Sequence, residues 1–103
     1  MELLIITATE EYEVEIKKIL KESGVNTFSH MPVSGFKNLK DQPKESNWFA
    51  KEVGEFKSIL FYAFVPKQNV PSIMEQINAF NATNNVLSKI HVAVMAVKET
   101  NIN

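Results

Sequence analysis

Cysteine is missing from this sequence, and glycine is scarce, with three residues in the whole chain. The lack of cysteine excludes disulfide bonds, thiolate catalysis and cysteine-ligated zinc. So few glycines leave no glycine-rich loop that could hold phosphate groups, and neither G-x-x-x-x-G-K-[ST] nor G-x-G-x-x-G occurs. The zinc-binding pattern H-E-x-x-H is also absent, and no serine stands with a histidine and an acid in a recognisable catalytic pattern. We therefore expect a protein that is not an enzyme.

The chain also lacks an excess of charge and a long apolar run. Eleven basic residues against twelve acidic ones give a net charge of −1, which offers no support for binding to nucleic acid or to a membrane surface. The first apolar run, Leu3 to Ile6, is too short for a signal peptide or a membrane span. With 103 residues, 45% of them hydrophobic, the chain is expected to fold as one domain over residues 1–103. We expect it in the cytoplasm, without direct membrane insertion.

The most apolar stretch of the chain is Ser58–Val65, which Pro66 ends. Its length predicts a strand, and successive side chains of a strand point to opposite faces of the sheet. Both faces of this strand are apolar, as in a central strand that is covered on both sides. One face carries Ile59, Phe61, Ala63 and Val65, and the other carries Leu60, Tyr62 and Phe64.

The remaining segments complete the order β-α-β-β-α-β. Amphipathic patterns predict a helix over 10–23, with Thr9 as its cap and Gly24 as its stop, and a second helix after Asn69. Pro32 places the second strand at a sheet edge or at a bulge. The predicted strands cover residues 2–8, 25–36, about 56–65 and 89–97.

Right-handed crossovers put both helices on one face of a four-stranded antiparallel sheet, which is the ferredoxin-like α+β fold. The first and third strands then lie in the middle, and these two are apolar on both faces. The two helices can cover only one face of the sheet. The sequence therefore predicts that the other face is buried in an oligomer.

The polar segment 37–47 separates the second and third predicted strands. It has little apolar surface to bury, so we expect a mobile loop that is either functional or merely tolerated. Gly35 precedes this segment and is either a turn glycine or a place where a ligand approaches bare backbone. Lys89, at the start of the last strand, is either a phosphate or carboxylate ligand or an ordinary solvated strand end.

His30 and His91 lie on the second and the last predicted strand, at opposite edges of the sheet. Imidazole is a common ligand of transition metals, and Met31 and Met95 could adapt such a site to copper(I). The two histidines could meet only across a subunit interface. The alternative is that both are ordinary strand histidines and both methionines fill the core.

In its layout the chain resembles the PII signalling proteins over nearly its whole length. Val33-Ser34-Gly35-Phe36 is similar to the family's Val-Lys-Gly-Phe before its T-loop, and Lys89-Ile90-His91-Val92 is similar to Gly-Lys-Ile-Phe-Val. The resemblance implies a homotrimer with the open sheet faces inward and a T-loop-like segment at about 37–55. It also implies ATP or ADP, often with 2-oxoglutarate, in clefts between subunits, and a T-loop that docks on a channel, an enzyme or a transcription factor. On this resemblance the ligand-binding residues are Gly35, Phe36, Lys37 and Lys89.

The sequence departs from the family pattern at several places. Lys37, Asn38 and Leu39 replace the family's glycines and its magnesium-binding glutamine, and the segment 83–88 has no glycine. The family's C-terminal arginines and its T-loop tyrosine have no counterpart. We therefore expect a divergent PII-like regulator that binds ATP or ADP weakly or not at all and acts on a partner such as a membrane transporter or an enzyme. The alternative is a metal-responsive binding protein linked to heavy-metal efflux or divalent-cation tolerance.

Overall fold

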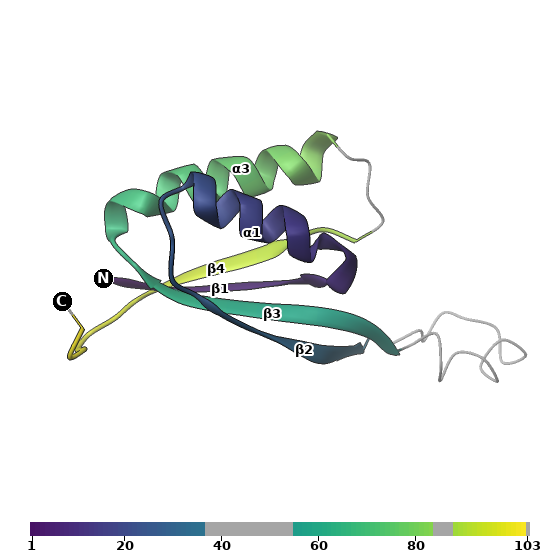
Figure 1. The fold of residues 1–103 in the computed structure, drawn as a ribbon, viewed down its shortest axis with the longest axis horizontal. Helices are drawn as coiled ribbons and strands as arrows, with labels where there is room; N and C mark the ends of the chain where they lie inside the picture. Colours follow the sequence, from purple (N-terminus) through teal and green to yellow (C-terminus); the bar gives the residue numbers. More distant parts are fainter. Residues whose placement is uncertain (37–54, 84–87, 103) are drawn as a thin grey trace, which may run out of the picture.

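A four-stranded antiparallel sheet carries both helices on one face in the computed structural model, which describes residues 1–36, 55–83 and 88–102 (Figure 1). The sheet order is β2-β3-β1-β4, so the first and third strands are central, as predicted. This is the expected ferredoxin-like βαββαβ fold. The elements are β1 (Glu2–Thr9), α1 (Glu13–Glu22), β2 (Ser29–Phe36), β3 (Glu55–Val65), α3 (Val70–Thr83) and β4 (His91–Ala96), with 3-10 turns at Glu10–Tyr12 and Lys67–Asn69.

The alternation of side chains along β3 determines where the core lies. The face with Ile59, Phe61, Ala63 and Val65 is buried beneath the helices, as the period-two pattern predicted for one of the two faces. Burying an aliphatic or aromatic side chain of this kind contributes roughly 1.5–3 kcal/mol relative to leaving it exposed. The helices supply the other half of the core with Ile16, Ile19, Leu20, Ile73 and Ile77.

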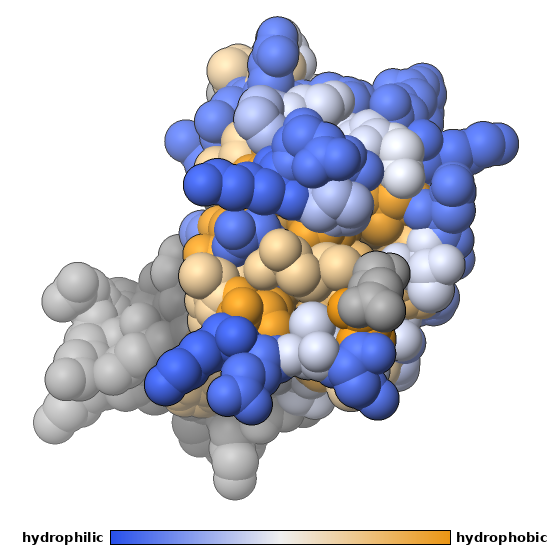
Figure 2. All heavy atoms as spheres, turned by 90° about the vertical axis from the view of Figure 1, so that its left-hand side faces the viewer, coloured by the Kyte–Doolittle hydropathy of each residue, from blue (hydrophilic) through white to orange (hydrophobic). Residues whose placement is uncertain are grey.

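The opposite face of the sheet has no cover among the described residues. Tyr62 and Phe64 of β3 are 37% and 42% exposed, and Met31 and Met95 on the edge strands are 47% and 44% exposed. Figure 2 shows the end of the molecule on the left of Figure 1, where the helix layer is largely hydrophilic and apolar residues gather below it. We call the side of the sheet away from the helices the open face.

Several predicted boundaries are wrong by a few residues. The segment 25–28 is not part of the second strand, which begins at Ser29. The N–H of Val25 donates to the carbonyl of Leu20 at 2.8 Å, so Val25 still belongs to the end of α1. The Thr9 side chain does not cap the first helix, which opens as a 3-10 turn. The last strand begins at His91 and not at Lys89. Pro32 does lie on an edge strand, where its missing N–H costs the fewest ladder bonds.

Gly24 is placed as expected, and an ion pair lies on the exposed side of α1. Gly24 follows α1 with a φ of 83°, the left-handed conformation that ends a helix. Lys17 Nζ lies 2.7 Å from Glu13 Oε2, one turn earlier. This hydrogen bond lowers the pKa of the Glu13 carboxyl below its ordinary value. Among the described residues, no helix is long and apolar enough to span a membrane.

Candidate functional site

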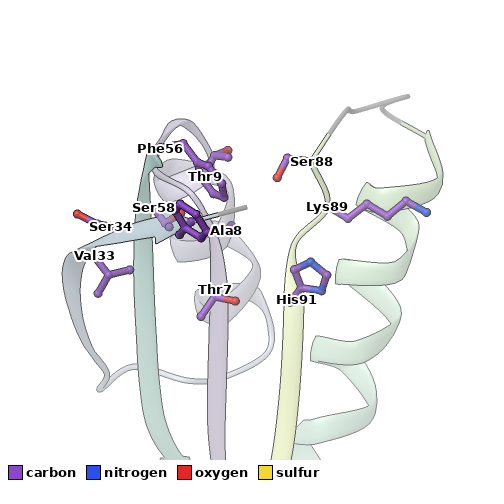
Figure 3. A pocket seen from close by; sticks show the side chains of 12 residues that line it. Thr7, Ala8, Thr9, Val33, Ser34, Phe56, Ser58, Ser88, Lys89 and His91 are labelled. Atoms are coloured by element: carbon purple, nitrogen blue, oxygen red, sulfur yellow. The ribbon is translucent and has the colours of Figure 1, made fainter. Parts of the chain in front are cut away.

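A cavity of about 320 Å³ lies at the end of the sheet where β2 ends and β3 begins. Strand register places most of its lining side chains on the open face, since Gly35 pairs with Phe56, Ser58 with both Val33 and Thr9, and Thr7 with His91. Figure 3 shows these residues around the cavity. The full lining is Thr7, Ala8, Thr9, Val33, Ser34, Gly35, Phe36, Phe56, Ser58, Ser88, Lys89 and His91.

The cavity brings together four residues that the sequence singled out. Gly35 and Phe36 come from the end of β2, and Lys89 and His91 come from the start of β4 and the segment before it. The fourth predicted ligand residue of the PII-like set, Lys37, lies outside the described residues, and so does most of the T-loop-like segment at 37–55. The predicted mobility of 37–47 falls outside them as well.

Hydroxyl groups dominate the polar part of this cavity. They come from Thr7, Thr9, Ser34, Ser58 and Ser88, and none of the described lining residues is acidic. Lys89 is exposed, and Figure 3 shows its side chain extending away from Thr7 and Ser58. The lysine stem is flexible enough to bring its ammonium group back toward a bound anion. The arrangement suits a small polar or anionic ligand.

Sequence reasoning missed these hydroxyl residues. Thr7 and Thr9 belong to β1, Ser58 belongs to β3, and Ser88 precedes β4. No motif connects residues so far apart in the chain, and only the pairing register places them at one end of the sheet. The one signal in the sequence was that each lies near the end of a predicted strand.

Gly35 lies within β2, opposite Phe56, and is not a turn glycine. A Cβ atom added to Gly35 would lie 2.5 Å and 2.8 Å from two carbons of the Phe56 ring and 2.8 Å from Ser58 Oγ. Such distances are too short for packed atoms. The phenyl ring of Phe56 therefore occupies the space beside Gly35. Glycine leaves room for the ring because it has no Cβ atom.

We predict that Gly35→Ala destabilises the protein by about 1–3 kcal/mol, because the methyl group overpacks this contact. Urea unfolding of the single variant and of the double variant Gly35→Ala, Phe56→Ala measures the effect. Once Phe56 is already alanine, the glycine replacement should have a clearly smaller effect. An equal loss in both backgrounds would show that the ring is not the reason for the glycine.

The two histidines occupy different environments. The His30 ring stacks on the core residue Phe61, with ring centroids 5.2 Å apart, on the helix-covered side of β2. His91 lies across from Thr7 on the open face, and β2 and β4 are the two edge strands. Within one subunit the two imidazoles therefore lie on opposite faces of the sheet and at its opposite edges. The described residues contain no group of three or more His, Cys, Asp or Glu side chains that could hold a metal ion.

Two of the solved structures that resemble this chain cover nearly the whole of it. The first is CPII, a nitrogen regulatory PII-like protein from Thiomonas intermedia bound to ADP, AMP and bicarbonate, at 16% identity and a TM-score of 0.60, covering 93% of this chain and 92% of that one. The second is a DUF3240 family protein from Shewanella baltica, at 14% identity and a TM-score of 0.67, covering 99% and 94%. No protein-family model and no curated protein sequence matches the chain.

At these identities the matches establish the fold. TM-scores of 0.60 and 0.67 over more than nine-tenths of each chain mean that the three proteins share an overall fold. The sequence had predicted this resemblance from the residues around Gly35 and Lys89. The chain therefore has the fold of the PII-like proteins.

Proposed function

We propose that this chain is a non-enzymatic PII-like regulator that binds a small anionic ligand in the cavity at the end of its sheet. In this proposal three subunits join through their open faces. The ligand changes the conformation of the segment 37–55, and this segment acts on a protein partner such as a membrane transporter or an enzyme. Regulation of this kind requires that the ligand bind two states of the segment with different affinities.

The observation that carries the proposal is the position of the cavity. Its lining includes Gly35 and Phe36, the last two residues before the segment 37–54, and Phe56 just after it. A ligand in the cavity would therefore contact residues that flank that segment on both sides. The cavity also borders the open face, so a neighbouring subunit that covers this face would complete its wall.

Assembly is supported by the apolar character of the open face. Leu3, Ile5, Leu60, Tyr62 and Phe64 form a continuous apolar patch across the two central strands by register. A patch of this kind on a soluble protein usually marks an interface. A second copy of the chain fits it because identical apolar faces leave no unpaired charge when they meet.

The charge of the cavity limits which ligand it can hold. Lys89 is the one lysine among the described lining residues, and the other polar side chains of the lining are five hydroxyl residues and His91. A triphosphate needs several cationic groups, each contributing roughly 1.5–3 kcal/mol through charge-assisted hydrogen bonds. A ligand of low charge, such as bicarbonate or a nucleoside monophosphate, matches one lysine better. CPII, which shares the fold, holds ligands of both kinds.

We predict that calorimetry will detect weak binding of ATP and ADP or none, and no cooperation with 2-oxoglutarate. Lys89→Ala should remove whatever nucleotide or bicarbonate binding the wild type shows, because it removes the cation at the cavity. Lys98→Ala, which changes an exposed lysine of the C-terminal tail, is the matched control and should bind as the wild type does. Tight, magnesium-dependent ATP binding would contradict the proposed charge limit.

Titrations with copper and zinc test the metal-responsive alternative. Metal binding through imidazole would be weakened by His30→Ala or His91→Ala and left unchanged by Lys89→Ala. It would also fade below about pH 6, where imidazole is protonated. Strong binding of this pattern would replace the nucleotide or bicarbonate proposal. Binding of none of these ligands would overturn the ligand part of the proposal and leave a role in protein interaction.

A further inference from the structure

We infer that Asn81 is a positioning residue that fixes the wall of the cavity formed by Ser88, Lys89 and His91. Its role as a determinant of ligand binding rests on the function proposed above. Its role in holding this wall rests on the geometry alone. Asn81 lies in the last turn of α3 and is not itself part of the cavity lining.

The Asn81 side chain makes two reciprocal hydrogen bonds to one backbone residue. Asn81 Nδ2 donates to the carbonyl oxygen of Ile90 at 2.9 Å, and the N–H of Ile90 donates to Asn81 Oδ1 at 2.9 Å. The planar amide therefore pairs with Ile90 as a neighbouring strand residue would. Both bonds are partly buried, which makes an unsatisfied backbone group there costly.

Ile90 lies between Lys89 and His91 and holds this wall of the cavity in place. The ladder between β1 and β4 ends at the pair Thr7 and His91, so Ile90 lies just outside the sheet. Its side chain is 3% exposed and anchors the segment in the core. Burial of one side chain does not fix the rotation of the backbone around it. The two bonds to Asn81 supply that restraint, with Lys89 on one side of Ile90 and His91 on the other.

The choice of residue at this position agrees with such a role. Asparagine is a weak helix former, less favourable than alanine or leucine in a helix, because its amide competes with the backbone for hydrogen bonds. At position 81 the amide makes both hydrogen bonds to Ile90, which an alanine or leucine side chain could not make. Asn78, one turn earlier on the same helix, is exposed and offers a matched comparison.

Asn81→Asp tests the inference through its dependence on pH. A neutral carboxylic acid can donate its O–H to the Ile90 carbonyl and accept the Ile90 N–H, which reproduces both bonds. The ionised carboxylate has no donor and faces the Ile90 carbonyl oxygen. Because only the neutral form fits, the pKa of the new carboxyl should lie above the ordinary value of about 4.

Hydrogen exchange and NMR shifts of Ile90 and His91 are measured from about pH 4 to pH 8 in the wild type, Asn81→Asp and the control Asn78→Asp. Lys89 and His91, the titratable groups next to Ile90, are common to all three proteins, so wild-type values at each pH correct for them. In Asn81→Asp we expect wild-type protection of the Ile90 amide at acidic pH and roughly tenfold or more faster exchange above the pKa of the new carboxyl. The His91 signals should move in the same pH range, and Asn78→Asp should show neither effect.

Affinities for bicarbonate and AMP, measured at pH 7.5, test whether the position of this wall affects ligand binding. We expect about tenfold weaker binding in Asn81→Asp for whichever of the two the wild type binds, with Asn78→Asp unchanged. If Asn81→Asp does not fold at neutral pH, Asn81→Ala serves instead, because it adds helix propensity and no charge and loses both bonds at every pH.

The possible outcomes separate the two proposals. Protected Ile90 and unmoved His91 signals in Asn81→Asp at pH 7.5 would overturn the positioning role, even if the melting temperature falls. Moved His91 signals with unchanged affinity would overturn its link to the ligand. A wild type that binds neither bicarbonate nor AMP would count against the proposed function, while the exchange data would still decide the positioning role.

Discussion

Phe61→Asp is expected to unfold the subunit. The Phe61 side chain is 1% exposed in the middle of the core, with the rings of Phe28 and His30 at centroid distances of 5.6 Å and 5.2 Å. Removing a buried phenyl group costs about 3–5 kcal/mol by itself. Placing a carboxylate without a partner in the same space adds a further desolvation penalty. The sum approaches or exceeds the total stability of about 5–15 kcal/mol that is usual for a domain.

Circular dichroism and urea unfolding measure this effect. Phe61→Leu, which keeps the site apolar and fills most of it, is the control and should remain folded with a modest loss of stability. A cooperative unfolding transition of Phe61→Asp close to that of the wild type would contradict the position of Phe61 in the core.

Tyr62→Asp, the same change one residue later, is expected to leave the subunit folded and to prevent its assembly. Tyr62 belongs to the open face and is 37% exposed in the single subunit. A carboxylate there is solvated in the monomer and needs no partner. In the proposed trimer it would be buried against apolar side chains of a neighbour, where an unpaired charge is strongly unfavourable.

Sedimentation at micromolar concentration distinguishes the two states. We expect the wild type at about three times the chain mass of 11.7 kDa and Tyr62→Asp at the monomer mass. Val14→Asp is the matched control, since Val14 is an apolar residue of α1 that is 75% exposed on the helix side. It should assemble as the wild type does. A monomeric wild type, or a Tyr62→Asp variant that still forms trimers, would refute assembly through the open face.

The opposite positions of these two neighbours follow from the sequence alone. Alternation along 58–65 is enough to assign Phe61 and Tyr62 to opposite faces, because the direction of a side chain on a strand is a local property of the backbone. The order of the elements, together with the handedness of crossovers, then determined the sheet order and the placement of both helices on one face. These inferences need only neighbouring residues and general rules of chain geometry.

The tertiary structure alone decided how the strands are aligned, and the site follows from that alignment. Register put Phe56 beside Gly35, gathered hydroxyl groups from separate strands around one cavity, and set His30 and His91 on opposite faces of the sheet. The tertiary structure also placed Asn81 within hydrogen-bonding distance of Ile90, the residue before the last strand. A shift of one residue in register moves every side chain of a strand to the other face. The register of the strands depends on packing between segments far apart in the chain, so no local pattern in the sequence could have determined it.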